Sequence, residues 1–418
     1  MSDKVYLCID LKSFYASVEC VERHLDPFKI NLVVADPSRG SGAITLAATP
    51  AIKELGVKSR GRIFEIPKGI EYITAKPRMA LYLEYSAKIY SIFLKFISKD
   101  DIHVYSIDES FLDVTSYISL YHKDAREIAK MIMDAILEET GIVSTCGIGP
   151  NLFLCKVALD INAKHSPDNI SYLDEDLFRQ TMWHHQPLTD FWMIGHGTVN
   201  RLNAIGIYDL YGVAHCNESY LYQLFGVNAE YLIDHSWGRE STTIQDIKKY
   251  KPAHQSMSNS QIFFEDYSYQ DAYLVMKEMV EINVLNLVDE HLVTNHIALY
   301  VGYSKNTIKP SRGSVKITNT TNSYKILLEE FKLLYKRVVN PHYPIRQISI
   351  SFGNVIDEIY EEYDLFADLE ELDKEKRLQQ AINEVHHKYG KNALVKGMNM
   401  YDKATGTKRN KMIGGHNA

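Results

Sequence analysis

The chain has few cysteines and no long apolar run, and these two absences already exclude several classes of protein. Its five cysteines are widely spaced, and none belongs to a Cys-x-x-Cys pair of the kind that marks a zinc or redox site. No stretch of about 18 apolar residues could cross a membrane, and the first apolar stretch, residues 5–9, is too short for a signal peptide. We therefore expect a cytoplasmic protein in a reducing compartment, with no membrane partner.

Net positive charge is also lacking, since the formal net charge is −7 at pH 7. Nucleic-acid-binding domains usually carry an overall basic charge, so any contact with nucleic acid has to be local. Residues 302–328 contain no acidic residue, and their basic residues alternate with Ser, Thr and Asn: Lys305, Lys309, Arg312, Lys316 and Lys325. This stretch could contact phosphates, or it could be a solvated strand surface whose lysines deter edge pairing.

The overall composition is that of a folded protein with several domains. At 418 residues the chain is too long for one core, and about 150 residues per domain suggests roughly three units. Hydrophobic residues make up 45% and charged residues 24%, which is ordinary for a globular protein. Short strands and helices alternate up to residue 170, short helices follow, and a β-α-β-β-α-β succession covers 260–352. This pattern predicts a multidomain α+β protein.

Three carboxylates occupy positions where strands end or turn. Asp108 and Glu109 lie within residues 104–114, between two short runs rich in β-branched and aromatic residues, and Asp10 closes the strand 5–9. Hard oxygen donors that converge from distant segments suit Mg²⁺ bound together with substrate phosphates. Taken alone, each position could equally be a solvated strand end, because surface carboxylates often have no special role.

The sequence around these carboxylates is more specific than the carboxylates themselves. Residues 8–19 read CIDLKSFYASVE and residues 105–113 read YSIDESFLD, and together they closely resemble two palm motifs of the Y-family DNA polymerases. The resemblance looks closest to the UmuC-like bacterial lesion-bypass branch and spans essentially residues 1–355. It implies a right-hand polymerase with a ferredoxin-like palm, small fingers, a helical thumb with a helix-hairpin-helix, and a split-βαβ little finger.

The resemblance and the element pattern together give expected domain boundaries. Residues 242–253 lack strong apolar periodicity and are expected to be a linker, and the polar residues 402–418 are expected to be poorly ordered. The expected domains are palm 1–13 and 80–170, fingers 14–79, thumb 171–241, linker 242–253, little finger 254–356 and C-terminal tail 357–418.

In the expected thumb, Gly195 and Gly197 precede a helical pattern and resemble the turn of a helix-hairpin-helix. Such a glycine turn aims backbone N–H groups at a DNA phosphate. The alternative is that these glycines only end a neighbouring helix, as glycines often do.

The resemblance implies a metal site at the palm motifs. Its expected ligands are Asp10, Leu11, Asp108 and Glu109, which would hold two Mg²⁺ ions. Asp10 and Asp108 would bridge both ions, and Glu109 would serve the ion that activates the primer 3′-hydroxyl.

The resemblance also implies nucleotide-binding residues. Tyr15 matches the family's steric gate, the ring that collides with a ribose 2′-hydroxyl, and Phe14 beside it is expected to pack within the same motif. Lys53 lies where the family places a cation on the triphosphate. Other branches have arginine there and tyrosine at the position of Pro50, so this contact departs from their pattern.

A second triphosphate cation is implied further along the chain. Lys164 resembles the family's lysine that follows the Lys156 and Asp160 pattern, although its spacing from Asp160 is one residue longer than in related branches. A lysine tolerates such a displacement better than a bidentate arginine. The alternative for Lys53 and Lys164 is that both are ordinary exposed helix lysines.

Near the C-terminus, residues 362–366 resemble the peptide by which such polymerases bind the sliding clamp. The usual leading glutamine is replaced by Glu362, while Leu365 and Phe366 would supply apolar anchors. The alternative is an acidic, partly helical tail without a partner.

The activity implied by the resemblance is low-processivity, template-directed DNA synthesis across lesions, as part of DNA repair and the SOS response to DNA damage. Its partners would be primer-template DNA, dNTPs and the sliding clamp, and the chain would be a monomer unless accessory subunits bind. One rival is another two-metal nucleotidyl transferase or cyclase, which would not need the downstream domains. Another is a non-catalytic DNA-binding relative that recruits repair factors, which would not need three like charges close together.

Overall fold

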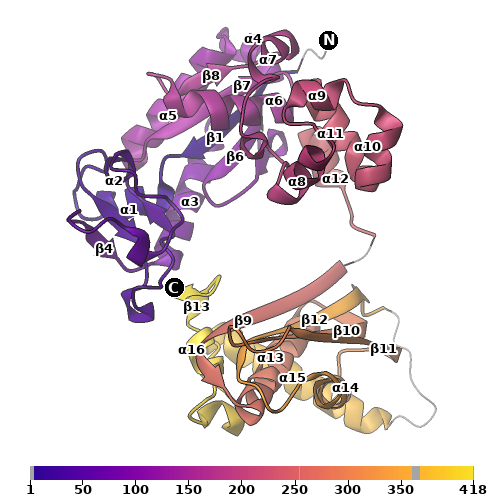
Figure 1. Cartoon of the computed structure of the whole chain (residues 1–418). Helices are drawn as coiled ribbons and strands as arrows, with labels where there is room; N and C mark the ends of the chain where they lie inside the picture. The colour runs from indigo at the N-terminus through magenta and orange to yellow at the C-terminus, as the bar shows by residue number, and fades with distance from the viewer. Residues whose placement is uncertain (1–3, 254, 360–367, 418) are drawn as a thin grey trace. The chain divides into compact units, whose positions relative to one another are not determined.

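The computed structural model describes residues 4–253, 255–359 and 368–417 (Figure 1). The chain divides into two compact units, residues 1–250 and 251–418. Each unit has its own apolar core. Across the described ranges, no helix is long and apolar enough to cross a membrane.

A five-stranded sheet with the strand order β5-β6-β1-β7-β8 organises the first unit. Strand β1 (Tyr6–Leu11) is central and pairs antiparallel with β6 (Glu109–Asp113) and β7 (Ser144–Gly149). It is buried along almost its whole length, as its near-continuous apolar sequence predicts. The outer strands are β5 (Ile102–Val104) and β8 (Ile170–Tyr172).

Helix α5 (Ala125–Thr140) packs on this sheet, and a capping residue lies at each of its ends. Asp124 caps its first turn, and Gly141 ends it with a positive φ of 71°. Helix α3 (Met79–Phe93) ends before Ser98, which caps a separate turn at Lys99–Asp101. Helix α4 (Thr115–Tyr121) also belongs to this region.

The segment expected to form the fingers has a small sheet with the order β3-β2-β4. Its core contains Val33, Ala48 and Ile52. The elements are α1 (Phe14–Val21), β2 (Leu32–Val34), β3 (Ala47–Ala48), α2 (Pro50–Glu54) and β4 (Ile73–Ala75).

The segment expected to form the thumb consists of short helices, as predicted. They enclose a cluster that includes Phe178, Leu202 and Leu221. The helices are α7 (Glu175–Met182), α8 (His196–Ala204), α9 (Leu210–Ala214), α10 (Glu218–Phe225) and α11 (Ala229–Ser236).

The first half of the expected linker 242–253 is instead a packed helix, α12 (Ile244–Lys249). Thr243 and Asp246 form a capping box at its start. Ile244 is fully buried against a cluster that contains Tyr6 and Phe111. One buried isoleucine and a good cap stabilise a helix in which apolar periodicity is weak, and the boundary between the two units, after residue 250, lies within the expected linker.

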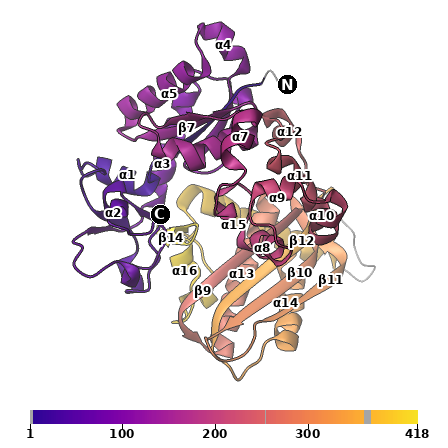
Figure 2. The same cartoon turned by 45° about the horizontal axis from the view of Figure 1, so that its top comes forward.

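The second unit contains a four-stranded sheet with the order β11-β10-β12-β9, visible as long neighbouring strands in Figure 2. Buried residues of two helices pack on the apolar side of this sheet. The predicted β-α-β-β-α-β order is confirmed: β9 (Gln255–Tyr267), α13 (Tyr269–Asp289), β10 (Leu292–Tyr303), β11 (Ser311–Thr321), α14 (Tyr324–Val338) and β12 (Ile345–Asp357).

The C-terminal segment is packed, contrary to the poorly ordered end expected from its polarity. The buried Glu278 carboxylate of α13 accepts hydrogen bonds from the backbone N–H groups of Thr405 (2.8 Å) and Gly406 (3.1 Å). Hydrogen bonds to this buried carboxylate hold the polar segment in place, although the segment has little apolar surface of its own. The elements are α15 (Leu369–Tyr389), α16 (Gly406–Arg409), β13 (Met412–Ile413) and β14 (His416–Asn417).

Candidate active site

The three predicted carboxylates meet at one end of the central strands. Asp10 is the register partner of Glu109 across the β1–β6 ladder. The backbone N–H of Leu11 donates to the carbonyl of Asp108 at 2.9 Å. The predicted turn between two strands is confirmed, because β5 and β6 pair antiparallel on either side of it.

Glu109 is held from the buried side of the sheet. It is 8% exposed, and the Lys156 amine lies 2.8 Å from its Oε1 and 2.9 Å from its Oε2. The Cys8 thiol donates to Oε1 at 3.1 Å. Burial, together with Cys155 and Glu109, raises the pKa of the Cys8 thiol, so this group stays protonated and can only donate.

Asp10 is poorly compensated by the protein. Burial raises the pKa of the Asp10 carboxyl to about 7, the Lys164 amine opposes this shift, and the carboxylates of Asp108 and Glu109 reinforce it. The Lys164 amine lies 3.9 Å from Oδ2 of Asp10, which is longer than a hydrogen bond. Asp108 accepts a hydrogen bond from the Ser106 hydroxyl at 2.7 Å.

Among the residues that the structure describes, no three His, Cys, Asp or Glu side chains form a ready-made metal cluster. The expected convergence is therefore partial, because Lys156 and Cys8 occupy the oxygens of Glu109. The donor set still fits a hard divalent cation: it consists of carboxylate oxygens, and the like charges around Asp10 are relieved by a cation.

A π-helical turn separates the two lysines that line these carboxylates, Lys156 in α6 and Lys164 in the turn Ala163–His165. Helix α6 (Leu152–Val157) continues into the π-helical turn Ala158–Asn162. Asp160 accepts the Lys156 amine at Oδ2 and the Lys164 amine at Oδ1, each at 2.8 Å. A π turn accommodates one extra residue within a helix, which accounts for the longer spacing between Asp160 and Lys164.

Tyr15 and Phe14 lie at the start of α1 in different environments. Phe14 is buried, as a packing residue should be, whereas Tyr15 is half-buried. The Tyr15 ring stacks on Tyr82 with a centroid distance of 4.4 Å and an interplanar angle of 15°. Burial raises the pKa of Tyr15, and the Asp108 carboxylate adds to this, which indicates that the phenol is near the carboxylates.

Lys53 lies in α2, and its amine donates to the Ser13 hydroxyl at 2.7 Å. Burial lowers the pKa of Lys53, and the positive charges of Lys164 and Lys12 contribute to this. Three lysines from separate segments therefore gather beside the carboxylates. Anions are the ligands that such a cluster favours.

Three further charged residues of this region, Lys12, Lys156 and Asp160, had no role expected from the sequence. The Lys12 amine donates to Oδ1 of Asn169 at 2.6 Å and lies in the motif that follows Asp10. Lys156 and Asp160 are four residues apart in sequence, the spacing of paired charges on one helix face. The sequence shows this spacing, but it does not show that Lys156 pairs with Glu109 in β6.

Gly195 and Gly197 lie at the start of α8, where the glycine turn was predicted. Gly195 is the N-cap residue, and Gly197 is in the first turn. A Cβ at either position would meet no atom within 4 Å, so internal packing does not require glycine there. Backbone N–H groups at this open helix start are accessible to a phosphate.

The basic residues of the second unit lie on and beside β11. Arg312 and Lys316 are exposed on this strand, while Lys305 and Lys309 lie in the loop that precedes it. Lys325 instead pairs with Glu371 at 2.9 Å. Beside Arg312 the sheet forms a hollow of about 480 Å³, whose lining combines apolar residues such as Leu299 and Ile350 with serines of several strands: Ser258, Ser314, Ser349 and Ser351.

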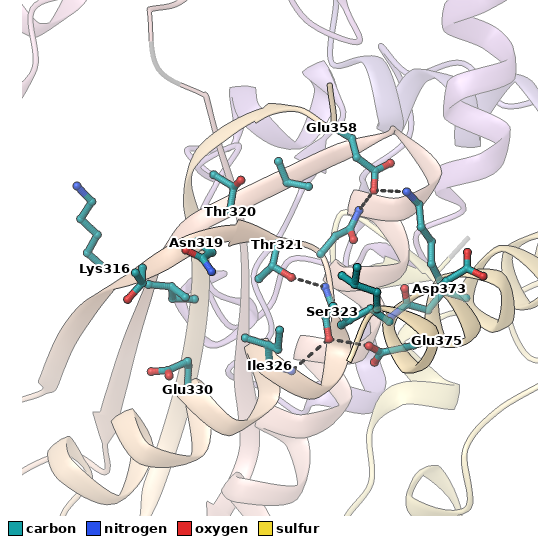
Figure 3. Close-up of a pocket in the computed structure, with 18 residues that line it drawn as sticks. Lys316, Asn319, Thr320, Thr321, Ser323, Ile326, Glu330, Glu358, Asp373 and Glu375 are labelled. Atoms are coloured by element: carbon teal, nitrogen blue, oxygen red, sulfur yellow. Dashed lines mark hydrogen bonds and ion pairs between the residues drawn. The ribbon is translucent and has the colours of Figure 1, made fainter. Parts of the chain in front are cut away.

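A second hollow of about 550 Å³ lies between the end of β11, the start of α14 and α15 (Figure 3). Figure 3 shows the Ser323 hydroxyl directed at Glu375, with an Oγ–Oε2 distance of 2.6 Å. The Glu358 carboxylate accepts from Lys376 at 2.8 Å. These polar contacts hold α15 against the rest of the second unit.

The predicted clamp-binding residues Glu362, Leu365 and Phe366 lie outside the described residues.

Comparisons with known proteins agree on one family. The impB/mucB/samB family matches residues 9–160, and its C-terminal domain matches residues 254–365. A Bacillus subtilis protein named "Putative UV-damage repair protein UvrX" is 30% identical and covers 99% of this chain and 97% of its own. DNA polymerase IV 2 of the same organism is 28% identical over 100% of this chain and 99% of its own.

A solved structure shows the same fold. The Y-family DNA polymerase chimera Dbh-Dpo4(243-245)-Dbh superposes with a TM-score of 0.66 at 21% identity, covering 84% of this chain and 99% of the chimera. The multidomain α+β architecture expected from the sequence is thereby confirmed.

Proposed function

This chain belongs to the impB/mucB/samB family and is a UmuC-like Y-family DNA polymerase of the translesion type, and from this premise we propose where and how it joins nucleotides. The reaction takes place where β1 ends and β6 begins, with Asp10, Asp108 and Glu109 as the catalytic carboxylates. The observation that carries the proposal is the direct register of Asp10 with Glu109 at one end of the two inner strands β1 and β6, next to Lys156 and Lys164.

Enzymes of this family depend on divalent metal ions, and the proposed ions here are two Mg²⁺. Asp10, Asp108, Glu109 and the Leu11 carbonyl would hold them. When bound, the ions supply charge stabilisation to the attacking hydroxyl and to the leaving pyrophosphate. The protein contributes a rigid strand end on which the carboxylates are fixed, and that rigidity keeps the site preorganised.

The incoming nucleotide would lie between the carboxylates and α1. Tyr15 excludes a ribose 2′-hydroxyl, because its ring stacks on Tyr82 and cannot easily move aside. Phe14, which is buried beside it, holds the start of α1 in place. Lys53 and Lys164 bind the triphosphate; burial, with the neighbouring charges of Lys164 and Lys12, lowers the pKa of Lys53, and a bound polyphosphate would compensate these like charges.

The primer-template duplex would be bound by separate surfaces. Gly195 and Gly197 offer backbone N–H groups to one phosphate at the start of α8. In the second unit, Lys305, Lys309, Arg312 and Lys316 would contact further phosphates, with the serine hydroxyls beside Arg312 as additional donors. These contacts read the backbone, so they tolerate any template sequence.

The proposal also includes the sliding clamp, the location in the cell and the oligomeric state. Leu365 and Phe366 would bind a hydrophobic pocket of the bacterial sliding clamp. The enzyme would act on chromosomal DNA in the cytoplasm, as a monomer with low processivity. Replacing Leu365 and Phe366 by alanine should abolish clamp stimulation and spare synthesis on short templates.

Template-directed extension is the test of this function. The wild-type protein, a labelled primer-template, Mg²⁺ and one dNTP at a time should give extension only with the dNTP complementary to the next template base. A template with a lesion should also be copied. Addition of nucleotides without regard to the template, or no addition at all, would contradict the proposal.

A further inference from the structure

Side chains of alternating charge form a connected row next to the active-site carboxylates. The Lys156 amine contacts both oxygens of Glu109, at 2.8 and 2.9 Å, and Oδ2 of Asp160 at 2.8 Å. The other oxygen of Asp160 holds the Lys164 amine at 2.8 Å, and that amine lies 3.9 Å from Asp10. Two carboxylates of the site are thus connected through a lysine, an aspartate and a second lysine.

The members of this chain differ in how freely they can move. The side chains of Lys156 and Glu109 are each only 9% exposed, so their ion pair is shielded from water. The Lys164 side chain is 40% exposed and can reorient at little cost. A buried charge that loses its partner is strongly destabilised, so Lys156 can release Glu109 only if another carboxylate receives it, and Asp160 is already in contact.

We propose that Lys156 and Asp160 are positioning residues for the metal side of the active site, an inference that rests on the polymerase function proposed above. Lys156 holds both oxygens of Glu109 when no metal ion is bound and thereby fixes the orientation of this carboxylate. It also competes with the metal for Glu109. Asp160 receives the Lys156 amine when Glu109 turns to the metal, and it links this exchange to Lys164 on the triphosphate side.

The first variant separates competition from positioning. Lys156→Met removes the amine and keeps an unbranched side chain of similar length. Without its competitor, Glu109 is free for a cation, so Mn²⁺ should bind about tenfold more tightly. The kcat of primer extension should nevertheless fall at least about tenfold, because partners that orient a metal ligand typically contribute about ten- to a hundredfold.

The second variant should move Mn²⁺ affinity in the opposite direction. Asp160→Asn keeps the shape of the side chain but removes the charge that receives Lys156. Lys156 then remains on Glu109, and Mn²⁺ affinity should fall about tenfold. The KM for dNTP should change as well, because Lys164 loses the same carboxylate. Asp160 is 25% exposed in its side chain, so this variant should fold even if Lys156→Met does not.

Both variants are measured alongside the wild-type protein by electron paramagnetic resonance of free Mn²⁺ and by steady-state primer extension. Lys95→Met is the matched control, because it breaks the exposed pair of Lys95 with Glu139, 2.6 Å apart, and should change neither readout. In a Glu109→Gln background, Lys156→Met should no longer tighten Mn²⁺ binding.

Opposite shifts of Mn²⁺ affinity in the two variants support the positioning role. Equal shifts, or unchanged affinity in both, would overturn it. If Lys156→Met does not fold, a fall in Mn²⁺ affinity in Asp160→Asn supports the role, and an unchanged or higher affinity overturns it. If the wild-type protein itself does not extend primers, the proposed function fails independently of this inference.

Discussion

Glu19 offers the clearest test of how the nucleotide-binding segment is held together. Its side chain is fully buried in α1. The Arg78 guanidinium donates Nε to Oε1 at 3.0 Å and Nη2 to Oε2 at 2.8 Å, and the Tyr82 hydroxyl donates to Oε1 at 2.7 Å. Arg23 also donates to Oε2. Because Tyr82 carries the stacked ring of Tyr15, this carboxylate supports the proposed sugar gate.

The cost of removing the Glu19 charge follows from these contacts. Glu19→Gln keeps the shape of the side chain but loses the charge-assisted fork to Arg78, and each such bond contributes about 1.5–3 kcal/mol net. We expect the free energy of unfolding to fall by about 3 kcal/mol at pH 7, near the lower end for a broken buried ion pair. For a unit of this size, that loss lowers the midpoint of thermal unfolding by about 6–12 °C.

The pH dependence has a definite sign. Burial alone would raise the pKa of Glu19, but hydrogen bonds from Arg78, Tyr82 and Arg23 outweigh it and hold the pKa below its usual value. The carboxylate therefore contributes its full stability above the unfolded pKa of about 4.3 and loses it as the pH falls through the lower folded value. The difference between wild type and Glu19→Gln should be full at pH 7 and shrink in acid.

Urea unfolding at several pH values measures this difference. Glu22→Gln is the control, because Glu22 is exposed and accepts one hydrogen bond from Tyr85 at 2.7 Å. That variant should lose less than about 1 kcal/mol. A Glu19→Gln protein as stable as wild type at pH 7, or a difference that persists unchanged in acid, would refute the reasoning.

Three further predictions concern the gate, the DNA surface and the C-terminal segment. Tyr15→Ala should lower the preference for deoxynucleotides at least about tenfold in matched primer-extension assays, and an unchanged preference in an active variant would assign the gate elsewhere. Replacing Arg312 and Lys316 by alanine should reduce the slope of log affinity against log salt by about 2; an unchanged slope would place the duplex on other residues. Glu278→Gln should expose the segment around Thr405 to limited proteolysis, since it weakens charge-assisted contacts of about 1.5–3 kcal/mol each, and wild-type resistance would contradict the pinning role of Glu278.

Local signals in the sequence predicted much of the fold. Helix α5 begins after Asp124 and ends before Gly141, and these two residues are good start and stop signals in the sequence. Strand β1 was predicted from its continuous apolar run, and the β-α-β-β-α-β order of the second unit from alternating periods. The Asp10 and Glu109 register was implied by the motif resemblance rather than by any local pattern.

The features that were not predicted depend on partners far apart in the chain. Ile244 forms a helix because it packs with Tyr6, and nothing near residue 244 indicates that partner. The C-terminal segment is ordered because Glu278 receives the N–H groups of Thr405 and Gly406. In the site, Lys156 meets Glu109 only once α6 packs against β7 and β1. Such contacts arise from tertiary packing, and the periodicity of the sequence does not indicate them.

We infer above all that the carboxylates where β1 ends and β6 begins catalyse metal-dependent nucleotide transfer. Asp108→Asn tests it most directly, because the change removes one charge and leaves the turn and the DNA-binding surfaces intact. Primer extension should fall at least about a hundredfold, since metal charge stabilisation supplies several kcal/mol at the transition state, while affinity for primer-template DNA stays within about twofold of wild type. Extension at the wild-type rate by a folded Asp108→Asn protein would contradict the claim.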